Sequence, residues 1–217
     1  MSEKADKMDA ESARIAATLP ASREALLSLA RELVNKYHAA ILAHDQVGAD
    51  AASATNEAVI WKLNGGTFFG CLDRENPEAG GNLVFAHCRA VPGAVPLWGQ
   101  NGEFLIEVDG VRAVVEVSDG FGDSLWPQFA FHAVDTKSDF ISETGYRSAM
   151  LETQYGKSMD EFARWHFAGF LKENRRPLAR EYREQVKLET WGWMIPAEVT
   201  VKDRRHEDAG GQLAFGF

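Results

Sequence analysis

The sequence contains little of what marks secreted, membrane or metal-binding proteins. Only Cys71 and Cys88 occur among 217 residues, without the CxxC spacing of zinc sites or the density of a disulfide framework. Residues 1–20 lack the apolar core of a secretory signal, and no run approaches the ~20 apolar residues that cross a bilayer. The sequence therefore predicts a bacterial cytoplasmic protein with reduced cysteines, no metal site and no membrane association.

The sequence also lacks an excess of basic residues. Its formal net charge is −9, and phosphate binding needs a basic surface, so direct binding to nucleic acid is not expected. Residues 103–161 hold twelve acidic and four basic side chains, whereas residues 172–187 hold six basic and three acidic ones. Two interpretations stay open: both are solvated surfaces, or the acidic region imitates a nucleic-acid backbone beside a small basic helix face.

Sequence motifs of catalysis are missing as well. The chain has no GxSxG, GxxxxGK[ST], HExxH or GxGxxG motif in a suitable context, so no catalytic residue and no cofactor is predicted. His87, Cys88 and His132 could assemble with Asp135 into a nucleophile and base, which would make the protein a small hydrolase. Nothing in their spacing requires this, and a histidine within a strand is commonly a partly buried, hydrogen-bonded group.

The amino-terminal part of the chain predicts helices. We expect residues 1–20 to be a flexible tail. Ser22 can cap a helix of about twenty residues, because apolar residues then recur at steps of three and four. A second helix is predicted over residues 51–63, and glycines at 65 and 66 end it because glycine adopts the left-handed conformation.

The middle of the chain predicts strands. Residues 67–72 are typical of a short strand, and residues 82–90 fit either a strand or a buried helix. The clearest signal is two β-rich runs over residues 103–117 joined by Asp109-Gly110, the pair preferred in a two-residue type I′ turn. Residues 124–134 predict a third strand.

Further helices are predicted towards the carboxyl terminus. Ser158 and Glu161 form a capping box, and Pro177 is well placed to start another helix. The sequence therefore predicts an α+β fold, with an antiparallel sheet containing a central β-hairpin flanked by N-terminal and C-terminal helices. We expect one domain over residues 21–196 and a flexible tail over residues 197–217.

The stretch FISETGYRS, residues 140–148, is unusual for its polar turn followed by a ring and a guanidinium. Tyr146 and Arg147 are candidate partner-binding residues of a surface recognition loop. The alternative is a structured turn between a strand and a helix.

Three segments of the body carry a family resemblance: WKLNGGTFFG, PGAVPLWGQNGEFLIEVDGVRA and FISETGYRS. They resemble uncharacterised accessory proteins of bacterial plasmids and integrative elements, over about residues 22–190. The resemblance implies a mobile genetic element as context and implies no particular reaction.

The carboxyl-terminal peptide QLAFGF carries a second resemblance. It is similar to the hexapeptide by which bacterial proteins bind the DNA sliding clamp, in the form that ends translesion polymerases. Gln212 and Leu213 match the first two positions, whereas Phe215 and Phe217 replace the usual aliphatic residues. Such a peptide gains affinity by placing apolar side chains in preformed pockets, and Gly210-Gly211 would let it leave the body.

Together these features predict a non-enzymatic accessory protein of a mobile element. Its terminal peptide would bind the sliding clamp, and its body would engage replication, repair or defence proteins. The alternatives are an acidic DNA mimic that inhibits restriction or CRISPR systems and, less simply, the small hydrolase. The oligomeric state is not predicted.

Overall fold

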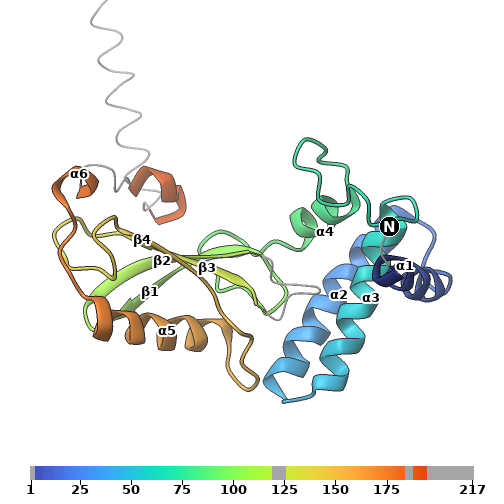
Figure 1. Ribbon diagram of the computed structural model, residues 1–217, viewed down its shortest axis with the longest axis horizontal. Helices are drawn as coiled ribbons and strands as arrows, with labels where there is room; N and C mark the ends of the chain where they lie inside the picture. Colours follow the sequence, from blue (N-terminus) through green and yellow to red (C-terminus); the bar gives the residue numbers. More distant parts are fainter. Residues whose placement is uncertain (1–2, 119–125, 184–187, 195–217) are drawn as a thin grey trace, which may run out of the picture.

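The computed structural model describes residues 3–118, 126–183 and 188–194. Its elements in chain order are α1 (Glu3–Ala16), α2 (Arg23–Leu42), α3 (Gln46–Leu63), α4 (Gly80–Cys88), β1 (Gly102–Val108), β2 (Val111–Ser118), β3 (Gln128–Ala133), β4 (Tyr146–Met150), α5 (Met159–Asn174), α6 (Arg180–Arg183) and the 3-10 helix η1 (Leu188–Met194). Figure 1 shows the helices α1 to α4 grouped beside a sheet that α5 covers on one face. The predicted α+β class is confirmed.

The helical group is built on the antiparallel pair α2 and α3 (Figure 1). As predicted, Ser22 caps α2: its Oγ accepts a hydrogen bond from the Ala25 amide at 3.2 Å. The helix α3 begins five residues earlier than predicted because Asp45 caps it, accepting from the Gly48 amide at 2.9 Å. One face of each helix is buried, as the apolar spacing requires.

The first helix, α1, occupies a segment for which the sequence predicts a flexible tail. It packs on α3, and Ala16 at its end is buried. The Trp61 indole donates to Asp9 at 3.0 Å, and the Lys62 ammonium donates to the carbonyls of Ala16 and Leu19 at 2.7 and 2.9 Å. These partners come from α3, about fifty residues away, so local polarity could not reveal them.

The sheet is four-stranded and wholly antiparallel, in the order β1-β2-β3-β4. The predicted hairpin is confirmed, since Val108 pairs with Val111 and both turn residues have positive φ, 50° for Asp109 and 74° for Gly110. The predicted third strand is confirmed as β3. The sequence does not predict the fourth strand, because the pattern of FISETGYRS indicates a loop or turn.

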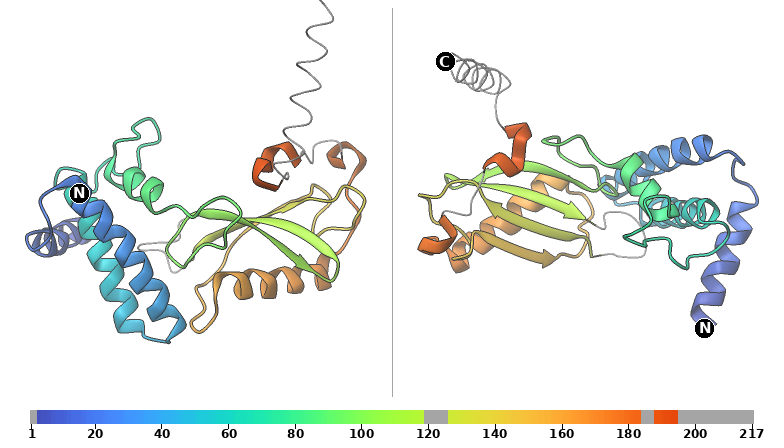
Figure 2. Two further views of the ribbon diagram at one scale, coloured as in Figure 1. Left: turned by 180° about the vertical axis from the view of Figure 1, so that it is seen from behind. Right: turned by 90° about the horizontal axis from the view of Figure 1, so that it is seen from above.

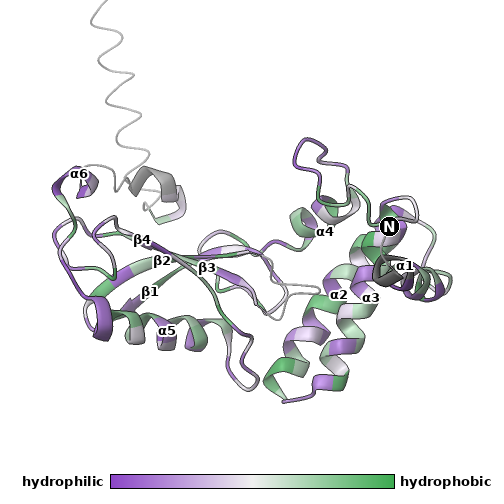
Figure 3. Cartoon of the chain, in the orientation of Figure 1, coloured by the Kyte–Doolittle hydropathy of each residue, from purple (hydrophilic) through white to green (hydrophobic). Residues whose placement is uncertain are grey.

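Helix α5 lies against one face of the sheet (Figures 1 and 2). Phe129 and Phe131 of β3 meet Phe162 and Phe167 of α5, with ring centroids 5.4 and 5.5 Å apart. Figure 3 shows hydrophobic and hydrophilic residues alternating along the helices and strands, as expected for elements with one buried face, and many hydrophilic residues in the connections. The sheet and the helix therefore share one buried aromatic layer.

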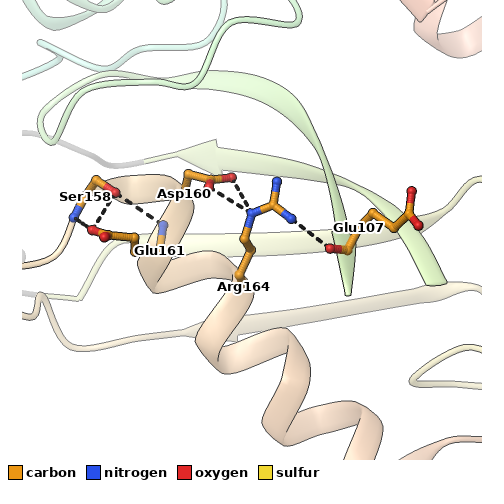
Figure 4. A network of polar contacts seen from close by, with 5 residues as sticks. All are labelled: Glu107, Ser158, Asp160, Glu161 and Arg164. Carbon is orange, nitrogen blue, oxygen red and sulfur yellow. Dashed lines mark hydrogen bonds and ion pairs between the residues drawn. The ribbon is translucent and has the colours of Figure 1, made fainter. Parts of the chain in front are cut away.

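The start of α5 is fixed by polar contacts (Figure 4). The predicted capping box is present: Ser158 accepts from the Glu161 amide, and the Glu161 carboxylate accepts from the Ser158 amide at 2.8 Å. Arg164 binds Asp160 one turn earlier and donates to the Glu107 carbonyl at 2.7 Å. The last bond attaches α5 to the hairpin.

The helical group and the sheet are joined through Trp98, which is almost wholly buried. Its amide donates to His38 Nδ1 of α2 at 3.2 Å, and its indole donates to the Lys157 carbonyl at 2.7 Å. Its ring also meets Phe162 edge-on at 5.2 Å. A single cluster of buried hydrophobic residues consequently extends through both parts.

Candidate functional site

The predicted clamp-binding residues Gln212, Leu213, Phe215 and Phe217 lie outside the described residues. The same holds for the whole segment expected to be a carboxyl-terminal tail. Binding of this peptide to a clamp stays a prediction.

Tyr146 and Arg147 lie in β4, and their side chains point to opposite faces of the sheet. The Tyr146 ring is 45% exposed and lies 5.0 Å from the His132 ring. The Arg147 guanidinium carbon lies 3.9 Å from the centroid of the Phe170 ring, a cation–π contact within the chain. Tyr146 thus keeps surface for a partner, and partner binding by either residue stays a prediction.

The candidate nucleophile and bases are not brought together. His87 and Cys88 end α4 in the helical group, whereas His132 lies in β3 and Asp135 follows that strand (Figure 1). Asp135 instead accepts two hydrogen bonds from Arg112, at 2.6 and 3.0 Å. Burial raises the pKa of the Cys88 thiol to about 11, which leaves it protonated and weakly nucleophilic at neutral pH. The hydrolase alternative loses its geometric basis.

His132 is partly buried, which agrees in part with the alternative that the sequence left open. Its Nε2 lies 3.5 Å from a Glu116 oxygen, and its ring contacts the rings of Tyr146 and Trp191, with centroids 5.0 and 5.1 Å away. Burial lowers the pKa of His132, and Glu116 opposes that shift. The histidine is therefore held mainly neutral, within a cluster of rings.

The acidic region is partly neutralised by basic side chains. Asp135 pairs with Arg112 in β2, while Asp139 pairs with Arg175 at 3.8 Å and Glu143 pairs with Arg176 at 3.5 Å. The last two arginines belong to the basic stretch 172–187, which therefore faces the acidic region instead of forming a separate surface. This arrangement does not favour a row of free carboxylates that imitates DNA.

A braced loop joins α3 to α4. The sequence predicts a strand over residues 67–72, but the structure has consecutive turns there, so that prediction is wrong. The Asn64 side chain explains the difference: its Nδ2 donates to the carbonyls of Thr67 and Phe69 at 2.8 and 3.0 Å, and its Oδ1 accepts from the Gly80 amide at 3.1 Å. These bonds occupy backbone groups that a strand would pair with a neighbour.

The far end of the same loop is tied to the start of α4. The Asn82 side chain donates to the carbonyls of Asp73 and Asn76 at 2.7 and 2.8 Å, and the Gly81 amide donates to the Cys71 carbonyl at 2.9 Å. A Cβ atom at position 80 would lie 2.5 Å from the Ile60 carbonyl oxygen, so glycine is needed for this close approach. The loop is thus fixed at both ends.

Basic side chains gather around this loop and α4. Arg23 of α2 pairs with Glu78 at 2.5 Å, Arg31 of α2 donates to the His87 carbonyl at 2.5 Å, and Arg74 is exposed in the loop itself. These three are half of the six lysines and arginines between residues 11 and 87. The same loop carries Asp73, Glu75 and Glu78, so this surface holds cations and carboxylates in equal number.

Comparison with known protein families finds a match for each part of the chain. Residues 11–87 match the family described as the KlcB N-terminal DNA-binding domain, and residues 101–189 match the family described as the KlcB third domain. The chain is similar to KlcB. The boundary between the two KlcB matches falls between α4 and β1, where the helical group meets the sheet. This likeness supports the expected resemblance to plasmid-associated accessory proteins.

Curated relatives agree with the domain matches. Two proteins named KlcB from Escherichia coli are 44% and 45% identical to this chain over 180 and 179 residues. The alignments cover 83% and 82% of this chain but 38% and 44% of the relatives, so the chain spans less than half the length of either KlcB protein. No solved structure matches the chain.

Membrane-spanning helices and metal clusters do not occur in the described part of this KlcB-like chain. None of the helices in the described ranges combines the length and apolar character needed to cross a bilayer. Among the described residues, no three His, Cys, Asp or Glu side chains are grouped so that they could hold a metal ion.

The helical group contains the residues that match the DNA-binding family, and sequence reasoning did not single it out. The net charge of −9 argues against a nucleic-acid partner for the chain as a whole. The charge of the sheet region does not, however, determine what the helical group binds. The separate net charge of residues 11–87, from nine acidic and six basic side chains, is still negative and does not by itself indicate a nucleic-acid partner. It shows that two thirds of the net negative charge lies elsewhere.

Proposed function

We propose that this chain is a DNA-binding accessory protein of a bacterial plasmid and that residues 11–87 contact duplex DNA. The match of these residues to the KlcB N-terminal DNA-binding domain carries the proposal. The proposal departs from the sequence expectation that nucleic acid is not a direct partner.

The charges near the loop before α4 support this assignment. Arg23 and Glu78 form an exposed pair, which contributes little to stability, so Arg23 can exchange its carboxylate partner for a phosphate at small cost. Arg74 is exposed in the same loop. Arginine suits this role because its planar fork binds phosphate oxygens in pairs.

A binding experiment tests the proposal. The full chain is titrated into a fluorescent random-sequence duplex of about 30 base pairs at low salt, and anisotropy reports binding. We expect saturable binding that the double variant Arg23→Ala, Arg74→Ala weakens about ten-fold, because each lost phosphate contact removes an electrostatic contribution. The matched control is Lys137→Ala, Lys172→Ala, which removes the same charge from exposed positions in the other lobe. Absence of binding by the intact chain, or equal weakening by both variants, contradicts the assignment.

The carboxyl-terminal peptide supports a second proposed activity, docking on the bacterial sliding clamp. The support is the resemblance of residues 212–217 to clamp-binding hexapeptides, with Leu213, Phe215 and Phe217 as apolar anchors and Gln212 fixing the register. Burial of each apolar anchor contributes ~1.5–3 kcal/mol, and ordering the peptide offsets much of that. We expect micromolar affinity.

Clamp docking is tested with purified clamp. Deletion of residues 212–217 should abolish binding measured by surface plasmon resonance, because it removes every proposed anchor. Lys202→Ala, ten residues before the peptide, is the control and should bind as the unaltered chain does. Equal binding with and without the peptide rejects docking. This outcome is independent of DNA binding by residues 11–87.

A further inference from the structure

One apolar side chain of the braced loop is almost wholly exposed. Phe69 is 92% exposed, and Leu72, three residues on, is 52% exposed. Single exposed apolar residues are common on protein surfaces. An almost wholly exposed phenylalanine nevertheless lacks the favourable free energy that burial of its ring would contribute. Whether the ring is held in place for a partner depends on the surrounding backbone.

The backbone holds Phe69 firmly. Its carbonyl accepts from the Asn64 side chain at 3.0 Å, and its amide donates to the Thr67 hydroxyl at 3.1 Å. Two residues later, Cys71 bonds to Phe68 on one side and to Gly81 of α4 on the other, at 3.2 and 2.9 Å. The ring is therefore presented from a fixed position, which lowers the entropy lost when a partner binds it.

The loop also projects from the molecule. Figures 1 and 2 show the segment before α4 extending away from the paired helices α2 and α3. Arg74 lies in this segment, and Arg23 of α2 reaches it by pairing with Glu78. Arg31 of α2 instead bonds to the carbonyl of His87 at the end of α4. An apolar ring on a projecting loop with cations beside it matches the way proteins insert apolar side chains between base steps while arginines hold the phosphates.

We propose that Phe69 stacks on, or inserts between, the bases of bound DNA, and that Arg23 and Arg74 hold the adjoining phosphates. This inference rests on the proposed DNA binding by residues 11–87 and names the side chain that meets the bases. Asp73 and Glu75 lie on either side of Arg74 in the same loop. We therefore expect the loop to enter a DNA groove by its edge, so that these two carboxylates stay in solvent, away from the phosphates.

The test uses the full chain and duplexes that carry 2-aminopurine at successive positions. Binding of the unaltered protein should raise the 2-aminopurine fluorescence, because an inserted ring unstacks the reporter base. Phe69→Ala should abolish this rise and weaken binding about ten-fold, in line with the loss of one base–aromatic stack. Phe69→Trp should retain both the rise and the affinity.

The matched control is Val47→Ala, which removes an 80% exposed apolar side chain from the opposite end of the same helical group and should change neither signal. Circular dichroism of each variant confirms folding, which an exposed side chain should not affect. If Phe69→Ala binds as tightly as the unaltered protein with the same fluorescence rise, the inference is overturned while DNA binding stands, and a protein pocket becomes the better partner for the ring. If the unaltered chain binds no duplex, both proposals fall together.

Discussion

At the scale of single residues, polar side chains in unusual places carry most of the information. Asn64 makes three hydrogen bonds that shape the loop before α4. Asn56 is the opposite case: it is fully buried in α3, and neither its Nδ2 nor its Oδ1 has a hydrogen-bond partner among the described residues. The first asparagine builds local structure, and the second only costs desolvation free energy.

We predict that Asn56→Leu stabilises the protein. An unsatisfied buried amide costs about 1–3 kcal/mol, and leucine has a similar shape, so the free energy of unfolding should rise by about 1 kcal/mol in urea denaturation. Asn35→Leu, at an exposed position of α2, is the control and should change stability by less than about 0.5 kcal/mol. A loss of stability in Asn56→Leu would show that the amide has a partner that matters.

A second residue-scale prediction concerns pH. Burial lowers the pKa of His38, and its Nδ1 accepts the Trp98 amide, a role that protonation would end. The unfolded chain, with a histidine pKa near ~6.5, then binds more protons than the folded one, so stability is complete above that pH and falls as the pH drops through it. His132 and His166 have pKa values shifted in the same direction by burial.

The melting temperature should therefore fall when the pH is lowered from about 7.5 to about 5.5, on either side of the histidine pKa. His38→Gln should reduce this fall, because a glutamine oxygen can still accept a hydrogen bond and does not titrate in this range. Thermal unfolding followed by circular dichroism at both pH values gives the answer, and an unchanged or higher melting temperature at the lower pH would contradict the proposed linkage.

At the scale of elements, local signals succeed where the partner of a group is a near neighbour in sequence. The capping box at Ser158 and the Asp109-Gly110 turn are complete within a few residues, and the sequence predicts both. The strand predicted over residues 67–72 fails because the side chain of Asn64, outside the apolar run, captures its backbone. The fourth strand escapes prediction because the alternation in β4 is weak, with its first, third and fifth residues exposed and no fully buried face between them.

We predict that Ser158→Ala destabilises the protein by about 1 kcal/mol, the usual cost of losing an N-cap side chain. The hydroxyl accepts from the Glu161 amide, and its loss also frees the Glu161 carboxylate from half of its partners. Urea denaturation measures the change. Ser28→Ala, exposed in the middle of α2, is the comparison and should be neutral or slightly stabilising; an equal effect at both serines would argue against the cap.

At the scale of the whole molecule, the chain joins a helical group to a sheet through one shared core. Trp98 links α2 with the start of α5, so the two regions that match separate KlcB domains are packed together. Residues 11–87 hold nine acidic and six basic side chains, so their own net charge is −3, out of −9 for the chain. The proposed DNA binding would therefore depend on individual arginines and not on a surface of net positive charge.

The sparse cations lead to a prediction about salt. With Arg23 and Arg74 as the proposed phosphate contacts, about two counterions are released, so a plot of log binding constant against log salt concentration should have a slope of about −2. Anisotropy titrations between about 50 and 200 mM salt measure the slope. A slope steeper than about −6 would require a larger basic surface than these residues supply.

Sequence by itself determined the features that depend on neighbouring residues and on composition. The α+β class, the capped helix α2, the central hairpin and the capping box of α5 follow from apolar periodicity, turn residues and N-cap residues, all of which act within a few positions. The sequence alone likewise shows that the chain lacks the catalytic motifs searched for.

Tertiary structure decided what depends on residues far apart in the chain. It placed α1 against α3 through Trp61 and Lys62, separated His87 and Cys88 from His132, and paired the acidic region with distant arginines. It also fixed an exposed ring at Phe69 on a braced loop. These features depend on contacts between residues that are tens of positions apart in the sequence. Local sequence patterns do not predict the free energies of such contacts.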